Sequence, residues 1–191
     1  AEKHGVTVTT SNDVETFYAL LKKTARRDRF GIHPKEHYEK LLETLPGSFL
    51  LMADIGSQMA EGSWQQSNLP SGLSHLPSDH CHLASLLGVI HNNTGYYYYG
   101  ASDEQYRHLM APSLLQWKAM KLCRARGCTR YDLLGIDAPP DGAATHPNEP
   151  QRVSSAWAGV TRFKKQFGGA VMIYPKEREI VLRPMMKKFI E

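Results

Sequence analysis

Hydrophobic residues in the first 30 positions follow a strand period and then a helical one. Residues 6–9 alternate between apolar and polar side chains, as a short strand does. Asn12, with Glu15 three residues later, has the spacing of a capping box, and we expect a helix to follow it. The apolar face of this helix is made by Val14, Phe17, Tyr18, Leu21 and Ala25.

A second helix is predicted to begin at His33-Pro34, because proline is tolerated in the first turn of a helix. Pro46-Gly47 ends it. Its apolar stripe consists of Tyr38, Leu41, Leu42 and Leu45. Three strands are expected next, at residues 48–55, 83–91 and 96–100, with residues 92–95 as the hairpin turn between the last two.

The second half of the chain is predicted to begin with a long helix over residues 112–126, which Gly127 ends. The remaining predicted elements are a strand at 129–136, a helix at 160–167 and strands at 170–174 and 179–183. This order is that of the GNAT acetyltransferase superfamily, an α/β (α+β) fold with a mixed central sheet and helices on both faces. We expect a single domain over residues 1–191.

Two stretches do not fit this compact plan. Residues 56–82 and 137–152 are rich in Gly, Pro, Ser, Asn and Asp, a composition typical of lids, binding loops or disorder when connections are this long. The first stretch is interpreted as an inserted loop.

Composition narrows the class of protein. No run of about 18 apolar residues is present, and the N-terminus lacks the order of a signal peptide, so we expect a cytoplasmic protein. The three cysteines, Cys81, Cys123 and Cys128, are expected to be free thiols. A net charge of +4 favours anionic partners such as phosphates or RNA, but ordinary domains reach this value too.

Five segments point to one family. The stretch at 157–169 contains Phe163-Lys164 before a Phe-Gly-Gly, and residues 96–102 form a tyrosine run that ends in Gly-Ala-Ser. Together with segments 27–31, 112–117 and 127–132, they resemble, in the same order, the second GNAT-like domain of the Fem family of peptidoglycan bridge-forming aminoacyltransferases.

The resemblance implies a function and its partners. A Fem transferase moves an amino acid from aminoacyl-tRNA to the stem peptide of a nucleotide- or lipid-linked peptidoglycan precursor, with no further cofactor. The family normally carries a first GNAT-like domain as well, and residues 1–5 look like the tail of a preceding segment. Two alternatives stay open: a non-catalytic precursor-binding module, and an acyl-coenzyme A dependent N-acyltransferase.

Lys164 is the candidate catalytic residue. Aminoacyl transfer passes through a tetrahedral oxyanion, and a fixed cation beside that oxygen lowers the barrier. By resemblance, the lysine directly after Phe163 does this work. The alternative is that Lys164 and Lys165 form a solvated basic face of a short helix.

Five further residues are candidates for substrate binding, and one of them, Phe163, is expected to lie buried beneath Lys164. Strand alternation predicts that Tyr97 and Tyr99 share one face, and the resemblance suggests that such tyrosines contact a sugar or peptide; plain packing in a strand is the alternative. By resemblance, Arg27 stands in the place of an arginine that contacts the precursor phosphates in the family, and Arg29 follows two residues later. The alternative for Arg27 is a cap at the end of its helix, where a cation offsets the helix dipole.

Two other kinds of site are not expected. GNAT enzymes hold the coenzyme A pyrophosphate in a glycine-rich turn, whereas residues 100–108 offer one glycine and the carboxylates of Asp103 and Glu104, so we expect no acetyl-coenzyme A site. Residues 79–82, with His75 nearby, lack the spacing of a closed zinc site, and no metal is expected. Cys81 has no positioned base that would make it a nucleophile.

Overall fold

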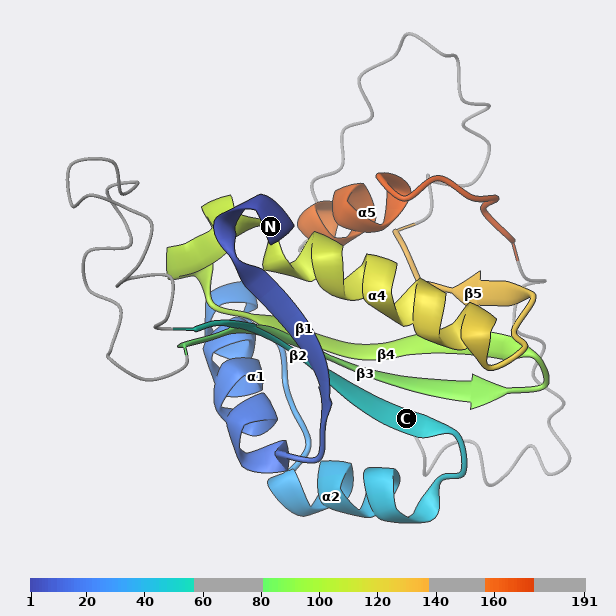
Figure 1. Cartoon of the computed structure of the whole chain (residues 1–191), viewed down its shortest axis with the longest axis horizontal. Helices are drawn as coiled ribbons and strands as arrows, with labels where there is room; N and C mark the ends of the chain where they lie inside the picture. Colours follow the sequence, from blue (N-terminus) through green and yellow to red (C-terminus); the bar gives the residue numbers. More distant parts are fainter. Residues whose placement is uncertain (57–80, 138–156, 174–191) are drawn as a thin grey trace, which may run out of the picture. The chain divides into compact units, whose positions relative to one another are not determined.

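A computed structural model describes residues 1–56, 81–137 and 157–173 (Figure 1). The chain divides into two compact units, Ala1–Ile136 and Asp137–Glu191. The prediction of one domain over residues 1–191 stays a prediction. Nearly all of the two expected loops, 56–82 and 137–152, lies outside the described residues.

The described part of the first unit is built on a five-stranded mixed sheet in the order β1-β2-β3-β4-β5. Neighbouring strands from β1 to β4 run antiparallel, and β5 runs parallel to β4. The strands are β1 (Val6–Ser11), β2 (Ser48–Ile55), β3 (Cys81–His91), β4 (Thr94–Ser102) and β5 (Arg130–Asp132). The helices are η1 (Glu2–His4), α1 (Val14–Asp28), α2 (Lys35–Thr44), η3 (Glu104–Leu109) and α4 (Ala111–Ala125).

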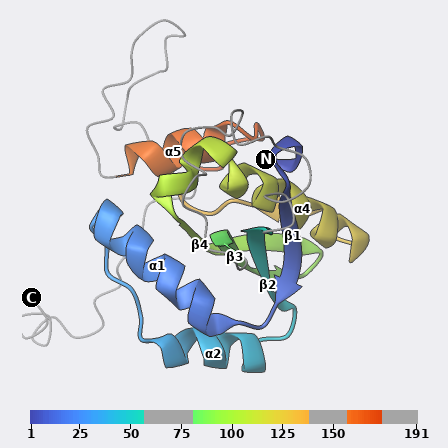
Figure 2. The ribbon, with the colours of Figure 1, turned by 60° about the vertical axis from the view of Figure 1, so that its left-hand side comes forward.

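Helices cover both faces of this sheet, as predicted. Helices α1 and α2 lie on one face and α4 on the other (Figure 2). Each face has its own core. The α1/α2 side is filled by Phe17, Leu20, Leu21, Tyr38, Leu50, Met52, Leu87 and Ala101, and the α4 side includes Phe49, Leu83, Leu86, Leu109, Leu115 and Cys123.

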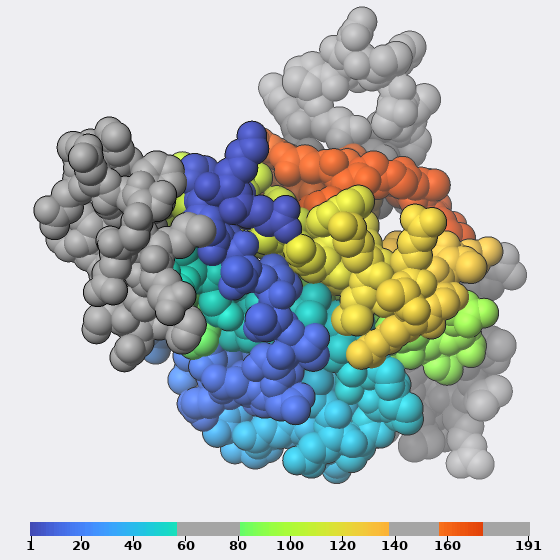
Figure 3. All heavy atoms as spheres, viewed as in Figure 1, coloured from blue at the N-terminus to red at the C-terminus, as the bar shows by residue number. Residues whose placement is uncertain are grey.

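The N-terminal segment packs beside α4. Lys118 of α4 forms an ion pair with Glu2 of η1 at 2.8 Å, and Figure 3 shows these two segments next to each other on the surface. Ala1 and Val8 also contact the core on the α4 side, so this segment is an integral part of the first unit.

The start of α1 differs from the predicted capping box. Its N-cap is Asp13, whose side chain accepts the amide N–H of Thr16 at 3.0 Å. Glu15 instead forms an ion pair with Lys35 of α2 at 2.6 Å. The helix begins one residue later than the Asn12 cap requires, and this leaves Glu15 free to reach the next helix.

Two strand boundaries also differ from the prediction. Asn92 and Asn93 adopt left-handed φ values of 46° and 57°, which makes a two-residue turn, so β4 begins at Thr94. Strand β5 ends at Asp132, although the predicted strand reached residue 136. The Asp132 carboxylate accepts the Leu134 N–H at 2.7 Å, and Leu134 has a φ of 58°, which ends the extended conformation.

The described part of the second unit contains helix α5 (Ala158–Lys165), two residues earlier than predicted. Residues 170–173 form no strand, contrary to the prediction for 170–174. A strand needs a ladder partner, and the partner expected at 179–183 lies outside the described residues. None of the helices in residues 1–56, 81–137 and 157–173 has the length and hydrophobicity of a transmembrane span.

Candidate functional site

Strands β4 and β5 part soon after they begin to pair. Residues 94–96 of β4 pair with residues 130–132 of β5, and among the described residues the rest of β4, from 97 to 102, has no strand partner on that side. An unpaired strand edge presents backbone N–H and C=O groups to a ligand. The open edge of β4 is therefore a candidate binding surface of the first unit.

The tyrosines of β4 do not alternate as predicted. Leu87 of β3 pairs with Tyr99, and its neighbour Gly88 pairs with Tyr97, which leaves Tyr98 as the extra residue of a bulge. Tyr97 consequently packs on the α4 side of the sheet and Tyr99 on the α1/α2 side. The prediction that Tyr97 and Tyr99 share a face is wrong, because the bulge inverts the alternation between them.

Tyr97 belongs to a buried polar cluster with Gln116 and Tyr131. The Tyr131 hydroxyl donates to Gln116 Oε1 at 2.9 Å, and the Gln116 side chain is fully buried. Burial raises the pKa of Tyr97 to about 12, against the opposing effect of its hydrogen bond with Gln116, and burial also raises the pKa of Tyr131. A Cβ added to Gly100 would collide with the Tyr97 hydroxyl, so this hydroxyl is directed along its own strand.

Tyr99 is part of an exposed aromatic strip that sequence reasoning did not identify. The strip consists of Tyr98, Tyr99, His37 and His33, with successive ring centroids 6.1, 6.5 and 4.2 Å apart. The Tyr99 ring packs at 5.1 Å against the buried Tyr38, and Tyr98 is 46% exposed. The exposed ring faces of this strip suit contacts with a sugar or a peptide. His33 precedes α2 and His37 lies in its first turn, four residues later, and this spacing alone does not indicate the strip.

Arg27 and Arg29 occupy different environments. Arg27 forms a two-pronged ion pair with Asp28, at 2.7 and 2.8 Å, and lies 3.3 Å from Glu104. The hydrogen bond with Asp28 raises the pKa of Arg27, and burial acts against this. Arg29 is the left-handed C-cap of α1, with an exposed side chain. The phosphate contact predicted for either arginine stays a prediction.

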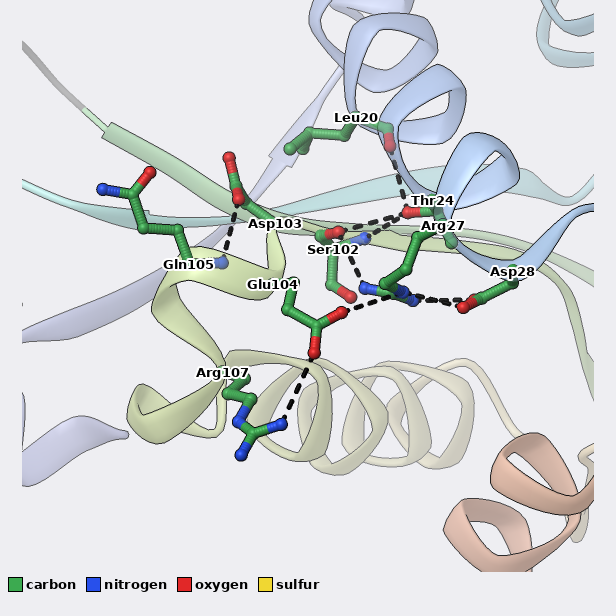
Figure 4. Close-up of polar contacts among 9 residues, drawn as sticks. All are labelled: Leu20, Thr24, Arg27, Asp28, Ser102, Asp103, Glu104, Gln105 and Arg107. Atoms are coloured by element: carbon green, nitrogen blue, oxygen red, sulfur yellow. Dashed lines mark hydrogen bonds and ion pairs between the residues drawn. The ribbon is translucent and has the colours of Figure 1, made fainter.

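The end of β4 is tied to α1 by polar contacts (Figure 4). The Thr24 hydroxyl accepts the Ser102 N–H at 2.9 Å, and Lys23 pairs with Asp103 at 2.6 Å. Burial opposes the charge of Asp103, but the hydrogen bonds from Lys23 and from the Gln105 N–H outweigh it and lower the pKa of this carboxyl. Asp103 and Glu104, the two carboxylates of the turn, are thus both paired with cations of the same chain.

Lys164 and Lys165 differ sharply in exposure. Within α5 the Lys164 side chain is only 7% exposed, whereas Lys165 is exposed, so Lys164 does not belong to a solvated basic face. The Phe163 ring, expected to be buried, is half-buried and meets Phe167 edge-on at 5.1 Å. The Thr161 hydroxyl on the same helix accepts the Asp137 N–H at 2.9 Å.

A metal centre is not formed by the residues that the structure describes, which contain no group of three or more His, Cys, Asp and Glu side chains placed to hold an ion. His75, Asp79 and His80 lie outside the described residues. His82 instead places Nδ1 at 2.6 Å from the carboxylate of Asp54 on the neighbouring strand. All three cysteines are free thiols, as predicted.

Sequence comparison finds the same family that the motifs suggested. The FemAB family model matches residues 57–191. Lipid II:glycine glycyltransferases of Staphylococcus aureus are 25% identical over 239 aligned residues, which cover the whole chain and 54% of the relative. The chain therefore spans about half the length of the curated relatives it matches.

Solved structures share the fold. The crystal structure of FemX has a TM-score of 0.66 at 21% identity, covering 86% of this chain and 50% of that one. An aminoglycoside acetyltransferase from an uncultured soil metagenomic sample, in complex with sisomicin, has a TM-score of 0.56 at 12% identity, covering 96% of this chain and all of that one. A putative acetyl transferase from Pyrococcus furiosus has a TM-score of 0.53 at 15% identity and 92% and 99% coverage. These matches confirm the GNAT-like fold.

Proposed function

The chain belongs to the FemAB family, and on that premise we propose that it is the acyl-transfer part of an aminoacyltransferase. It moves an amino acid from aminoacyl-tRNA to a side-chain amine in the stem peptide of a lipid- or nucleotide-linked peptidoglycan precursor. Support comes from the relatives, whose name, lipid II:glycine glycyltransferase, describes this class of reaction. The acyl donor needs no further cofactor, and a second GNAT-like domain is a partner for the precursor.

The reaction converts an ester into an amide. The amine nitrogen of the acceptor attacks the ester carbonyl, and a tetrahedral intermediate forms with a negative oxygen. The bond to the tRNA ribose then breaks, and the proton lost by the amine ends on the ribose oxygen, carried by the substrates themselves. The barrier falls when a cation is already fixed beside the carbonyl oxygen on which charge develops.

The observation that carries the proposal is the burial of Lys164 beside the exposed Lys165. Lysine is rarely buried in proteins without a functional or paired environment, because removing an ammonium group from water is costly. A sequestered ammonium acts more strongly on a nearby oxyanion than a solvated one, because less water screens it. We assign oxyanion stabilisation to Lys164, with Phe163 as the neighbouring wall of the site.

Precursor binding is assigned to the first unit. The aromatic strip offers ring faces to the sugar or the stem peptide, with Tyr99 held in place by Tyr38. The exposed Arg29 is able to approach phosphates, and Arg27 lies two residues before it with its guanidinium on Asp28. Tyr97 supports the β4 strand from the opposite face.

A mass-spectrometric transfer assay tests the proposal, with charged tRNA and a lipid- or nucleotide-linked precursor as substrates. In the protein that carries this chain, Lys164→Ala is expected to lower turnover about 10²-fold or more with little change in precursor binding. Lys165→Ala is the matched control and is expected to be nearly neutral. Equal, small effects of both variants would refute the role of Lys164.

The same assay separates the two other functions. A protein that binds the precursor but transfers nothing, with and without the remainder of a full-length relative, is a binding module. Transfer from an acyl-coenzyme A and not from aminoacyl-tRNA would identify an N-acyltransferase of the ordinary GNAT kind. The ion-paired carboxylates at the end of β4 speak against the latter.

A further inference from the structure

The turn from β4 into η3 carries a cluster of cations that is neutralised from within the chain. Lys23 and Arg27 project from α1, and Arg107 from η3. Asp103 pairs with Lys23 at 2.6 Å. Glu104 lies 3.3 Å from Arg27 and 3.4 Å from Arg107, so it stands between the two guanidinium groups (Figure 4).

The backbone of this turn is held in place, which fixes where the carboxylates lie. The Asp103 N–H donates to the Leu83 carbonyl at 2.9 Å, and the Asp103 side chain accepts the Gln105 N–H at 3.1 Å as the cap of η3. The Asp103 side chain is 15% exposed, whereas its partner Lys23 is 62% exposed. Asp103 is thus held in place by its hydrogen bonds, whereas Lys23 is the exposed member of the pair.

The cations without these two acids would form an ordinary phosphate site. Guanidinium groups bind phosphate oxygens with paired hydrogen bonds. With the acids present, a diphosphate that enters the turn meets two like charges and must displace them from their partners. Close like charges repel, and this repulsion weakens the binding of a diphosphate at the turn.

We propose that Asp103 and Glu104 are specificity-determining residues that exclude diphosphate-linked acyl carriers, such as coenzyme A thioesters, from the end of β4. They occupy the cations of α1 and η3 as internal counterions. The protein thereby discriminates against the wrong carrier by a built-in repulsion, in addition to any contact that it makes with the right one.

Calorimetric titration with coenzyme A and with ADP tests this inference. The unmodified protein is expected to show no saturable binding below millimolar concentration. Asp103→Asn combined with Glu104→Gln is expected to bind both probes at least about tenfold more tightly, in a salt-sensitive manner, because Lys23 and Arg107 lose these counterions and Arg27 keeps only its partly exposed pair with Asp28. Asparagine retains the cap of η3.

The matched control is Glu2→Gln combined with Glu15→Gln. It removes two carboxylates that also pair with lysines, Lys118 and Lys35, and changes the net charge equally, but away from the turn. This control is expected to behave like the unmodified protein. If affinity for the two probes rises equally in the control and the test variant, the change in net charge explains the effect and the proposal is wrong.

Two other results would overturn the proposal as well. One is micromolar binding of coenzyme A by the unmodified protein, and the other is an unchanged affinity in a test variant that melts like the unmodified protein. Should the double variant fail to fold, Glu104→Gln alone leaves the Asp103 cap intact. This single variant is expected to bind coenzyme A and ADP at least about threefold more tightly than the unmodified protein. The readout is ligand binding, so a failure here leaves the proposed aminoacyl transfer untouched, and loss of the Lys164 effect does not bear on this inference.

Discussion

Thr24→Val tests the contact that ties α1 to the end of β4. The Thr24 side chain is 6% exposed, and its hydroxyl accepts the Ser102 N–H at 2.9 Å. The same hydroxyl lies 3.0 Å from the Leu20 carbonyl and 3.2 Å from the Ser102 carbonyl, one of which receives its proton. Valine has nearly the same shape, so the substitution removes the hydrogen bonds and leaves the packing in place.

The expected cost follows from what is left unpaired. The Ser102 N–H loses its acceptor in a part-buried position, and a carbonyl loses a donor, which together destabilise the fold by about 1–2 kcal/mol. For a chain of this size, that corresponds to a fall in Tm of roughly 2–8 °C. Urea unfolding should show a lower midpoint at an unchanged m value, and amide exchange at Ser102 should become faster.

Thr44→Val provides the matched control. Thr44 makes the same kind of hydroxyl contact, to the Lys40 carbonyl at 2.7 Å, but it is exposed on α2 and ties no two elements together. We expect its effect to lie within about 0.5 kcal/mol. A Thr24→Val variant that costs no more than Thr44→Val, with unchanged exchange at Ser102, would show that the tie contributes nothing.

Two further experiments probe the core on the α4 side. Gly95→Ala should lower the free energy of unfolding in urea by about 1–3 kcal/mol, because a Cβ there would lie 2.4 Å from Cys123 Sγ. Adding Cys123→Ala should recover most of this stability. If the effects of the two substitutions simply add, the clash is not the cause. Because the pKa of Tyr97 is raised to about 12, the folded state holds this proton more tightly than the unfolded state, and stability should fall as pH rises from about 10 towards 12. Tyr97→Phe should reduce that alkaline loss, and an unchanged slope between pH 9 and 11 would count against the buried hydroxyl.

The sequence was most informative where periodicity follows from burial. The stripe that includes Phe17 and Leu21 predicted α1, and the apolar run at 48–55 predicted β2, because each pattern reflects a face that the sheet buries. The end of β5 was missed because it depends on a single local contact, the acceptance of the Leu134 N–H by Asp132. Aspartate is common inside and outside such turns, so its presence alone did not indicate the stop.

The bulge in β4 lay beyond any local pattern. Four successive tyrosines have the same propensity at each position, and only the pairing with β3 decides which of them is the extra residue. Gly88 of β3 is where the register shifts, and the Phe49 ring occupies the space that a Cβ at Gly88 would need. Contacts between strands distant in the chain therefore set the faces of Tyr97 and Tyr99.

The candidate site shows the same division between local and tertiary information. The motif around Lys164 was visible in the sequence, but the difference in burial between Lys164 and Lys165 was not, since neighbouring lysines on a short helix have equal propensities. His33 and His37 became candidates only through their stacking at 4.2 Å and the contact of His37 with Tyr99. Ring contacts between α2 and β4 cannot be read from either segment alone.

The resemblance predicts that Arg27 contacts a phosphate, whereas the structure pairs it with Asp28 and Glu104. The charges around Arg27 indicate how the two are compatible. Its pair with Asp28 is partly exposed, and exposed ion pairs contribute only about 0–1 kcal/mol, so an incoming phosphate displaces Asp28 at little cost. Asp103 and Glu104 stay paired with the cations of the turn. A single phosphate that approaches Arg27 from the Asp28 side is therefore compatible with the cluster, whereas a diphosphate seated in the β4 turn would face the fixed charge of Asp103. Under the proposed function, we expect the side of approach, more than the identity of the arginine, to decide which phosphate-bearing substrate this surface accepts.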